Sequence, residues 1–360
     1  IPRCGLYLHH AGPCRLPVRL AARSRKMNGS PASRGLKKRD SRRPLFLDEV
    51  QLRDGWEKFA VSLYDRKEKI KIFVTGSSSK LLQSEIATLL SGRYFSEIVH
   101  PLSFGEFLDF KNVKFKGIKH SAIYHYLQEY IEFGGFPRVV LEKDKNQKLK
   151  ILEEYYSSIV EKDVILRNKI KNVREVKELL LFLFSNIGNQ ISTYNIEKTI
   201  GISNENARRY IEYFKEAFLL NMVDFFSYQV KKQIYNSKKV YATDTGLATV
   251  AAFRFSENKG RLLENIIFNY LNLIKKKIFY WKNKSEADFI TRKGYNIDNI
   301  YNVCWSLKDK ETIKRELESL KILKKEFGNN KVKIIFFEKD SLLKEKYFIN
   351  VVDLISQNQP

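Results

Sequence analysis

Two apolar runs, residues 45–49 and 70–75, flank an amphipathic segment at 55–67. Each run has the length and composition of a buried strand, and the segment between them places Trp56 and Phe59 on one helical face. A strand, a helix and a second strand at this spacing predict a βαβ unit, whose two strands are parallel neighbours in one sheet. We therefore predict an α/β protein with a parallel sheet in the N-terminal part of this chain.

The rest of the chain alternates between helical and strand-like patterns. Residues 119–190 are predicted to be helical, with one break at Phe133-Gly134-Gly135-Phe136-Pro137. Residues 191–221 predict two helices joined by a turn at 201–203, and two strand-like stretches follow in the pattern of a winged helix-turn-helix. The last region is predicted to be α/β, with helices at 260–275 and 310–327 and strands at 278–282, 286–291, 299–304 and 331–337.

The chain is strongly basic, with a formal net charge of +24. Residues 1–43 hold +11 of this charge and residues 44–360 the other +13, so the body itself is basic enough to favour nucleic-acid binding. The 3 cysteines include no CxxC pair, which argues against a disulfide framework or a zinc knuckle and favours the reducing cytoplasm. No stretch approaches the ~18 consecutive apolar residues of a membrane-spanning helix, so no membrane association is predicted.

The first 43 residues differ from the rest in composition. They are rich in Arg, Pro, Ala and Gly, and they begin with Ile1, whereas the remainder is rich in Lys, Ile, Asn, Phe and Tyr. An Arg-rich segment whose one acid is Asp40 resembles an organelle transit peptide, but its apolar positions show no sustained helical period. We therefore predict a disordered basic leader or sequence from outside the natural reading frame, with Met27 as an alternative start.

The first apolar run ends abruptly in two carboxylates, Asp48 and Glu49. At the carboxyl end of a parallel strand in a nucleotide hydrolase, such an Asp holds Mg²⁺ and the following Glu polarises the attacking water. The next strand ends in small polar residues, of which Thr75 and Ser77 are candidates to sense the γ-phosphate of ATP. Arg93 is a candidate to reach the nucleotide of a neighbouring subunit. The pair alone is a weak signal, because many strands end in acids where they reach solvent.

Ten motifs follow one another between residues 44 and 340, namely LFLDEVQ, VTGSSSKLL, LSGRYF, HPLSFGEFL, EFGGFP, VEKDVILRNKIKN, ARRYIEYFKEAFLL, KVYATDTGLA, GRLLENIIFNYL and YWKNKSEADFI. Their order resembles the prokaryotic AAA-type ATPases, abundant in archaea, that carry a C-terminal domain of unknown function. The resemblance implies a P-loop-type AAA sheet, ATP and Mg²⁺ as ligands, and a homo-oligomer formed through the ATPase core.

The chain departs from this family at one point. Members carry a phosphate loop, GxxxxGK[ST], after a central strand that precedes the Asp-Glu strand and lies beside the strand ending at Thr75. No Gly-Lys-Ser/Thr occurs in the 360 residues of this sequence. We therefore expect either an N-terminally truncated ATPase or a chain that binds no nucleotide productively.

The predicted winged helix-turn-helix carries basic side chains at the positions that would face DNA. Arg208, Arg209 and Lys215 lie on its second helix, and Lys231 and Lys232 lie in its predicted wing. Because such a second helix enters the major groove, these residues are candidate contacts to double-stranded DNA. The alternative is a docking module on which they form a solvated face. A non-enzymatic DNA-binding protein is the main alternative function.

The last region follows the order of the PD-(D/E)xK nuclease fold, with Glu264 on a helix and then Glu286-Ala287-Asp288 ending a strand. This chemistry uses carboxylates to hold a metal and a lysine to assist the attacking water. Asn302 and Cys304 stand where the acid and the lysine are expected, so we predict a degenerate nuclease-like domain, with an active nuclease as the alternative. Asp244-Thr245-Gly246 matches the aspartic-protease triplet only once, and the family resemblance makes it a structural turn.

These patterns predict one function and a series of segments. The function is that of an ATP-binding AAA-type ATPase, inactive as written because the phosphate loop is missing. The segments are a basic leader at 1–43, a partial AAA core at 44–115, a helical lid or linker at 116–180, a winged helix-turn-helix at 181–245 and a nuclease-like domain at 246–360.

Overall fold

The computed structural model describes residues 3–9, 43–50, 53–65, 70–77, 94–114, 120–252, 259–328, 332–339 and 347–356. The chain divides into two compact units, with the boundary between Val99 and His100. Among the described residues, no helix is long and apolar enough to cross a bilayer.

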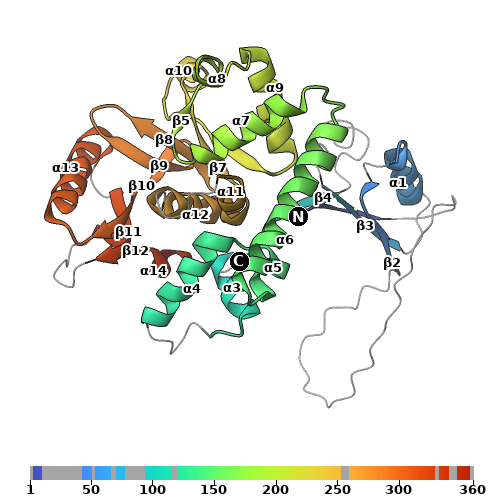
Figure 1. Ribbon diagram of the computed structural model, residues 1–360, viewed down its shortest axis with the longest axis horizontal. Helices are drawn as coiled ribbons and strands as arrows, with labels where there is room; N and C mark the ends of the chain where they lie inside the picture. The colour runs from blue at the N-terminus through green and yellow to red at the C-terminus, as the bar shows by residue number, and fades with distance from the viewer. Residues whose placement is uncertain are drawn as a thin grey trace. The chain divides into compact units, whose positions relative to one another are not determined.

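The N-terminal unit is built on a four-stranded sheet in the order β2-β3-β1-β4. β2 (Arg43–Leu47) and β3 (Ile70–Gly76) are parallel and are connected through α1 (Trp56–Asp65), which confirms the predicted βαβ unit (Figure 1). The helix buries Trp56 and Leu63 in one apolar cluster with residues of both strands. This packing fixes the two strands side by side with their carboxyl ends at the same edge.

β1 (Arg3–His9) lies in the segment for which we predicted a disordered leader. It is a central strand of this sheet, between β3 and β4 (Phe95–Val99), and it runs antiparallel to both. The family resemblance assigns this place beside β3 to the strand before the phosphate loop. Because β1 is antiparallel, its carboxyl end lies at the edge opposite the one where β2 and β3 end. Most of the predicted leader, residues 10–42, lies outside the described part of the chain.

The C-terminal unit begins with a helical region, as predicted, and the helices break at Gly134 and Gly135. One of them, η3, is a π-helix that continues directly from α6. The helices are α3 (Phe104–Phe110), α4 (His120–Phe133), α5 (Pro137–Leu141), α6 (Lys145–Ser158), η3 (Ile159–Leu166), α7 (Val173–Ser185), α8 (Thr193–Ile200), α9 (Asn204–Glu216), α10 (Val230–Tyr235), α11 (Thr245–Ala252), α12 (Lys259–Leu273), α13 (Lys310–Phe327) and α14 (Val351–Ser356).

The turn between α8 and α9 lies where the sequence predicts it. Gly201 ends α8 with φ of 72°, a left-handed conformation that glycine adopts without a steric penalty. Ser203 begins α9 by accepting a hydrogen bond from a backbone N–H in the first helical turn. The strands before and after these two helices form a three-stranded antiparallel sheet. Its order is β5 (Gln190–Ile191), β7 (Lys238–Ala242) and β6 (Leu220–Val223). α10 lies between β6 and β7 in the chain, where the wing is predicted.

The remaining strands form a five-stranded sheet in the order β12-β11-β10-β9-β8. Within the central strand β10, Ile300 and Cys304 join an apolar cluster with residues of α13, whereas Tyr301 joins a cluster with residues of α12. The two helices therefore lie on either side of β10 (Figure 1). The order α12, β8, β9, β10, α13, β11 is the predicted one. The strands are β8 (Lys277–Lys282), β9 (Glu286–Lys293), β10 (Asn296–Leu307), β11 (Val332–Lys339) and β12 (Phe348–Asn350).

Candidate functional site

The predicted carboxylate pair lies at the edge of the sheet where β2 and β3 both end. Parallel pairing of Leu47 with Val74 brings the next residues, Asp48 and Thr75, together. The hydroxyl Oγ1 of Thr75 donates a hydrogen bond to Oδ1 of Asp48. The backbone N–H of Glu49 donates to the same hydroxyl over 3.4 Å. Thr75 therefore ties the tips of the two strands together and orients the Asp48 carboxylate.

Glu49 adopts a backbone conformation that is uncommon for its residue type, with φ of 52°. A left-handed conformation costs a residue with a Cβ roughly 1–3 kcal/mol, and such residues concentrate at functional sites. Asp48 is exposed and Glu49 is half-buried, so both carboxylates are accessible from solvent. Glu49 therefore combines an uncommon backbone conformation with access to solvent at the end of β2.

The oxygens at this turn fit one half of a Mg²⁺-ATP site. Mg²⁺ takes few protein ligands and keeps several waters, and the carboxylate of Asp48 and the hydroxyl of Thr75 are ligands of the right kind. No group of three or more His, Cys, Asp or Glu side chains is arranged to hold a metal ion in the part of the chain that the structure describes. The remaining ligands would be water and phosphate, and this sequence contains no phosphate loop to position the phosphates.

Two further residues, Ser77 and Arg93, were predicted to belong to the ATPase site. Thr75 contacts Asp48 directly, and Ser77 is 6% exposed and lies just beyond β3. Arg93, the predicted arginine finger, lies outside the described residues.

The basic side chains on α9 are largely balanced by acids on the same helix. Arg208 and Arg209 are exposed, but Nζ of Lys215 forms an ion pair with Glu212 at 2.7 Å. The helix carries three basic residues and three Glu, so its formal charge is zero. A helix that docks in the major groove gains affinity by neutralising phosphates, and α9 has little net charge for that role.

The predicted wing has a different character from α9. Lys231 and Lys232 lie on α10, a helix that has no buried residue. Tyr228 and Tyr235 flank them and are 78% and 79% exposed. This segment therefore presents positive charge and aromatic rings to solvent.

The nuclease-like candidates Glu264 and Asp288 meet around a lysine from another sheet. Nζ of Lys239, on β7, lies 3.0 Å from Glu264, 2.9 Å from Asp288 and 2.9 Å from Glu286. The hydroxyl of Tyr241 also donates to Glu264, over 2.6 Å. Sequence reasoning missed Lys239, and it named Glu286 only as part of the segment that ends in Asp288. The one signal for Lys239 is a charged residue within the strand KKVYA, whose other members are mostly buried.

Asn302 and Cys304, which replace the expected acid and lysine, have separate surroundings. The amide Nδ2 of Asn302 donates to Ser319 over 2.9 Å, and its neighbour Val303 donates its backbone N–H to Asp288 over 2.9 Å. Sγ of Cys304 donates to the carbonyl of Ser306, and burial raises the pKa of this thiol to about 11. Cys304 is therefore neutral at pH 7 and does not supply the positive charge of the expected lysine.

Burial and mutual charge shift the pKa values in this cluster in opposite directions. Burial, together with repulsion from Asp288, raises the pKa of Glu264 to about 7 despite the nearby ammonium. Burial disfavours the charged form of Lys239, but the three carboxylates outweigh it and raise the pKa of Lys239 well above its ordinary value. Burial would also raise the pKa of Glu286, but attraction to Lys239 lowers it instead. Lys239 is thus charged at neutral pH.

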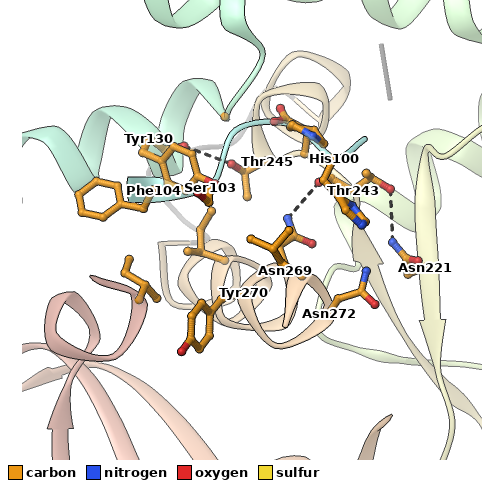
Figure 2. Close-up of a pocket in the computed structure, with 16 residues that line it drawn as sticks. His100, Ser103, Phe104, Tyr130, Asn221, Thr243, Thr245, Asn269, Tyr270 and Asn272 are labelled. Atoms are coloured by element: carbon orange, nitrogen blue, oxygen red, sulfur yellow. Dashed lines mark hydrogen bonds between the residues drawn. The ribbon is translucent and has the colours of Figure 1, made fainter. Parts of the chain in front are cut away.

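A polar pocket lies beside Asp244-Thr245-Gly246 in the same unit. Figure 2 shows Asn269 donating to the carbonyl of Thr243 and Asn221 donating to the Thr243 hydroxyl. The buried carboxylate of Asp244 accepts the backbone N–H groups of Gly135 at 2.7 Å and Gly246 at 2.9 Å. Asp244 therefore ties the turn to the Gly-Gly break between α4 and α5, which gives this triplet a structural role.

Two family models match the chain in separate places. One is described as an AAA domain and matches residues 19–108. The other is described as a domain of unknown function (DUF8612) and matches residues 124–259. The AAA match covers the strand β2 with Asp48 and the strand β3 with Thr75, so the coarse assignment of the N-terminal sheet agrees with the prediction.

Two curated relatives resemble the chain over most of its length. An uncharacterized protein of Methanocaldococcus jannaschii is 38% identical over 330 residues, which cover 86% of this chain and 73% of that protein. An uncharacterized protein of Haemophilus influenzae is 33% identical over 259 residues, which cover 70% of this chain and 63% of that protein. The chain thus spans less than two thirds of the second relative.

A solved structure also resembles the chain in part. The Walker-type ATPase PABY2304 of Pyrococcus abyssi is 19% identical, and the match covers 58% of this chain and 62% of that chain with a TM-score of 0.37. The protein of Methanocaldococcus jannaschii, at 38% identity, is much more similar in sequence to this chain than the solved ATPase is. The chain carries an AAA domain and belongs to the family that includes the uncharacterized protein of Methanocaldococcus jannaschii.

Proposed function

We propose that this chain is the ATPase module of a cytoplasmic AAA-domain protein, with Asp48 and Glu49 at the metal-and-water end of its nucleotide site. The observation that carries the proposal is the contact of Asp48, Glu49 and Thr75 at the carboxyl ends of two parallel strands. Ligands of open α/β sheets bind at this edge. The match to an AAA domain over the same residues supports it.

Each residue has a separate role in this proposal. Asp48 holds hydrated Mg²⁺, and the Thr75 hydroxyl orients its carboxylate. Glu49 accepts a hydrogen bond from the attacking water and aligns it. Bound Mg²⁺-ATP supplies the phosphoanhydride that is cleaved. Arg93 acts on the nucleotide of a neighbouring subunit in a homo-oligomer.

The 360-residue chain is proposed to be inactive by itself. Its sequence contains no Gly-Lys-Ser/Thr to hold the β- and γ-phosphates. The central strand β1 ends at the edge opposite Asp48, so a loop directly after β1 would begin far from the carboxylates. The module therefore needs a phosphate loop delivered to the edge where β2 and β3 end.

A graft tests the site and the missing loop together. A strand followed by GxxxxGK[ST] is designed to take the place of residues 3–9 but to run parallel to β3, so that its loop begins at the edge where β2 and β3 end. Mg²⁺-dependent phosphate release is measured for the original chain and the graft. The original chain is expected to show no turnover, and the graft to gain turnover that Glu49→Gln and Asp48→Asn abolish. Turnover by the original chain that Glu49→Gln removes would show that the loop is dispensable. Turnover by the graft that persists in Glu49→Gln would remove the proposed role of Glu49.

DNA binding through the wing is a second candidate function. The specific observation in its favour is the exposed pair Lys231 and Lys232 between two exposed tyrosines. Affinity for a duplex is expected to fall steeply between ~50 and ~200 mM salt and to be unaffected by ATP. Loss of both charges in Lys231→Glu with Lys232→Glu is expected to lower the salt slope by about 2. Fluorescence anisotropy that shows equal binding by this variant would contradict the proposed contact.

A further inference from the structure

The ammonium of Lys239 is surrounded by three acids, as a bound metal ion would be, and is not paired with one acid as in an ordinary ion pair. Its ammonium has three N–H donors, and three separate carboxylates lie within 3.0 Å of its nitrogen. The side chain is 2% exposed, so water does not compete for these donors. The ammonium therefore donates hydrogen bonds to Glu264 and Asp288 and forms an ion pair with Glu286 as well.

The three acids need a positive charge at this place. Glu264, Glu286 and Asp288 surround one point, and like charges brought together in a poorly hydrated site repel strongly. Lys282 contacts Glu286 from outside the cluster, at 2.9 Å, and compensates only one of them. In metal-dependent hydrolases a divalent cation supplies the central charge.

We propose that Lys239 is the resident cation of this cluster, that it excludes a divalent metal, and that it clamps the three-stranded sheet to the five-stranded sheet. β7 belongs to the first sheet, and β9, which carries Glu286 and Asp288, belongs to the second. A metal would have to displace an ammonium that all three acids bind. The proposal is independent of the ATPase assignment.

The surroundings of the cluster agree with an ammonium rather than a metal. The second oxygen of Asp288 is occupied by the backbone N–H of Val303. Asn302 brings a neutral amide to the strand position where an additional acid is expected, so this position adds no further carboxylate to the three around Lys239. No metal-binding group is present among the residues with described positions.

Substitution of Lys239 tests the proposal against a matched neighbour. Lys239→Ala removes the charge and opens space, and Lys238→Ala removes the adjacent lysine, which pairs with Asp224 at the half-exposed surface. Thermal unfolding of the full chain is followed with EDTA and with Mn²⁺. The original chain and Lys238→Ala are expected to melt at nearly the same temperature and to ignore Mn²⁺. Lys239→Ala is expected to melt at a lower temperature in EDTA and to gain roughly 5–10 °C when Mn²⁺ is at ~100 times its Kd.

Two results would overturn the proposal. One is Mn²⁺ binding by the original chain, seen in its electron paramagnetic resonance spectrum and lost in Asp288→Asn, because the metal and the ammonium would then coexist. The other is a Lys239→Ala variant as stable as Lys238→Ala in EDTA. If Lys239→Ala does not fold, Lys239→Met combined with Glu264→Gln, Glu286→Gln and Asp288→Asn removes the lysine charge and all three acid charges together. This variant is expected to fold, because it nearly keeps the volume of each side chain and leaves no charge in the cluster unbalanced. Failure to fold would overturn the proposal, because the cluster would then be needed for something other than its charge balance.

Discussion

Asp244 is a fully buried carboxylate whose hydrogen bonds hold a turn and a helix break together. It accepts backbone N–H groups from Gly135 and Gly246, and burial raises its pKa to about 6 although these bonds favour the ionised form. In Asp244→Asn the side-chain amide NH₂ replaces one carboxylate oxygen, so one of these backbone N–H groups faces another donor and loses its acceptor. We expect the free energy of unfolding in urea to fall by about 2–3 kcal/mol.

A second Asp→Asn substitution serves as the control for Asp244. Asp224 pairs with Lys238, and its side chain is 45% exposed. Surface ion pairs contribute about 0–1 kcal/mol, so Asp224→Asn should change the free energy of unfolding by less than that. Equal losses in the two variants would contradict the structural role of Asp244.

Glu264 should make stability depend on pH in a particular direction. Its pKa is raised to about 7 in the folded protein, mainly by burial, so folding favours the protonated carboxyl. A raised pKa gives a contribution that is complete below the ordinary value of 4.5 and is lost as pH rises through about 7. The Gln side chain of Glu264→Gln is neutral at every pH, so this variant does not lose free energy of unfolding as the pH rises. Urea unfolding should show Glu264→Gln gaining on the original chain from pH 5 to pH 8, by on the order of 3 kcal/mol. A difference that is constant with pH would refute the shift.

The turn between α8 and α9 depends on one glycine. Gly201 has φ of 72° and open space where a Cβ would be, so Gly201→Ala meets a conformational penalty and no collision. We expect a loss of about 1 kcal/mol in the free energy of unfolding. Gly260, near the start of α12, also has open space but no positive φ, so Gly260→Ala should be neutral or stabilising by up to ~1 kcal/mol. Circular dichroism during urea unfolding compares the two, and the opposite order would contradict this account.

Elements that depend on local pattern were predictable from the sequence. The helix α13 has the predicted bounds, 310–327, because its apolar residues recur with a helical period and Asp309 caps it. The parallel pair β2 and β3 follows from the strand–helix–strand spacing. The reversed strand β1 was not predictable, because its pairing with β3 joins residues more than sixty positions apart that share no sequence pattern.

In the candidate sites too, local pattern was predictable from the sequence and long-range contact was not. Asp48 and Thr75 were predicted together because parallel strands bring their carboxyl ends to one edge. The partner of Glu264 and Asp288 was missed because Lys239 comes from a different sheet, 25 and 49 positions away in the chain. A motif read along one segment does not show which side chain another segment inserts into it.

The apolar cores of the two units share no residue among those the structure describes. The cluster around Trp56 and Val74 lies within the N-terminal unit, and the other two clusters lie within the C-terminal unit. We therefore expect residues 100–360, expressed alone, to unfold in one thermal transition at the temperature that the same unit shows in the full chain. Differential scanning calorimetry of both proteins checks this. A midpoint more than a few degrees lower would show that the C-terminal unit needs the N-terminal unit for its stability.

The ammonium of Lys239 also constrains how such a chain can evolve. A gene rearrangement that exchanged the three-stranded sheet for one without this lysine would leave Glu264, Glu286 and Asp288 without Lys239. One that exchanged the five-stranded sheet would leave Lys239 with Glu264 of α12 as its one remaining acid of the three. Both products would fold poorly. The two sheets are therefore expected to be inherited as one block, and natural fusions in this family should break the chain outside residues 239–288.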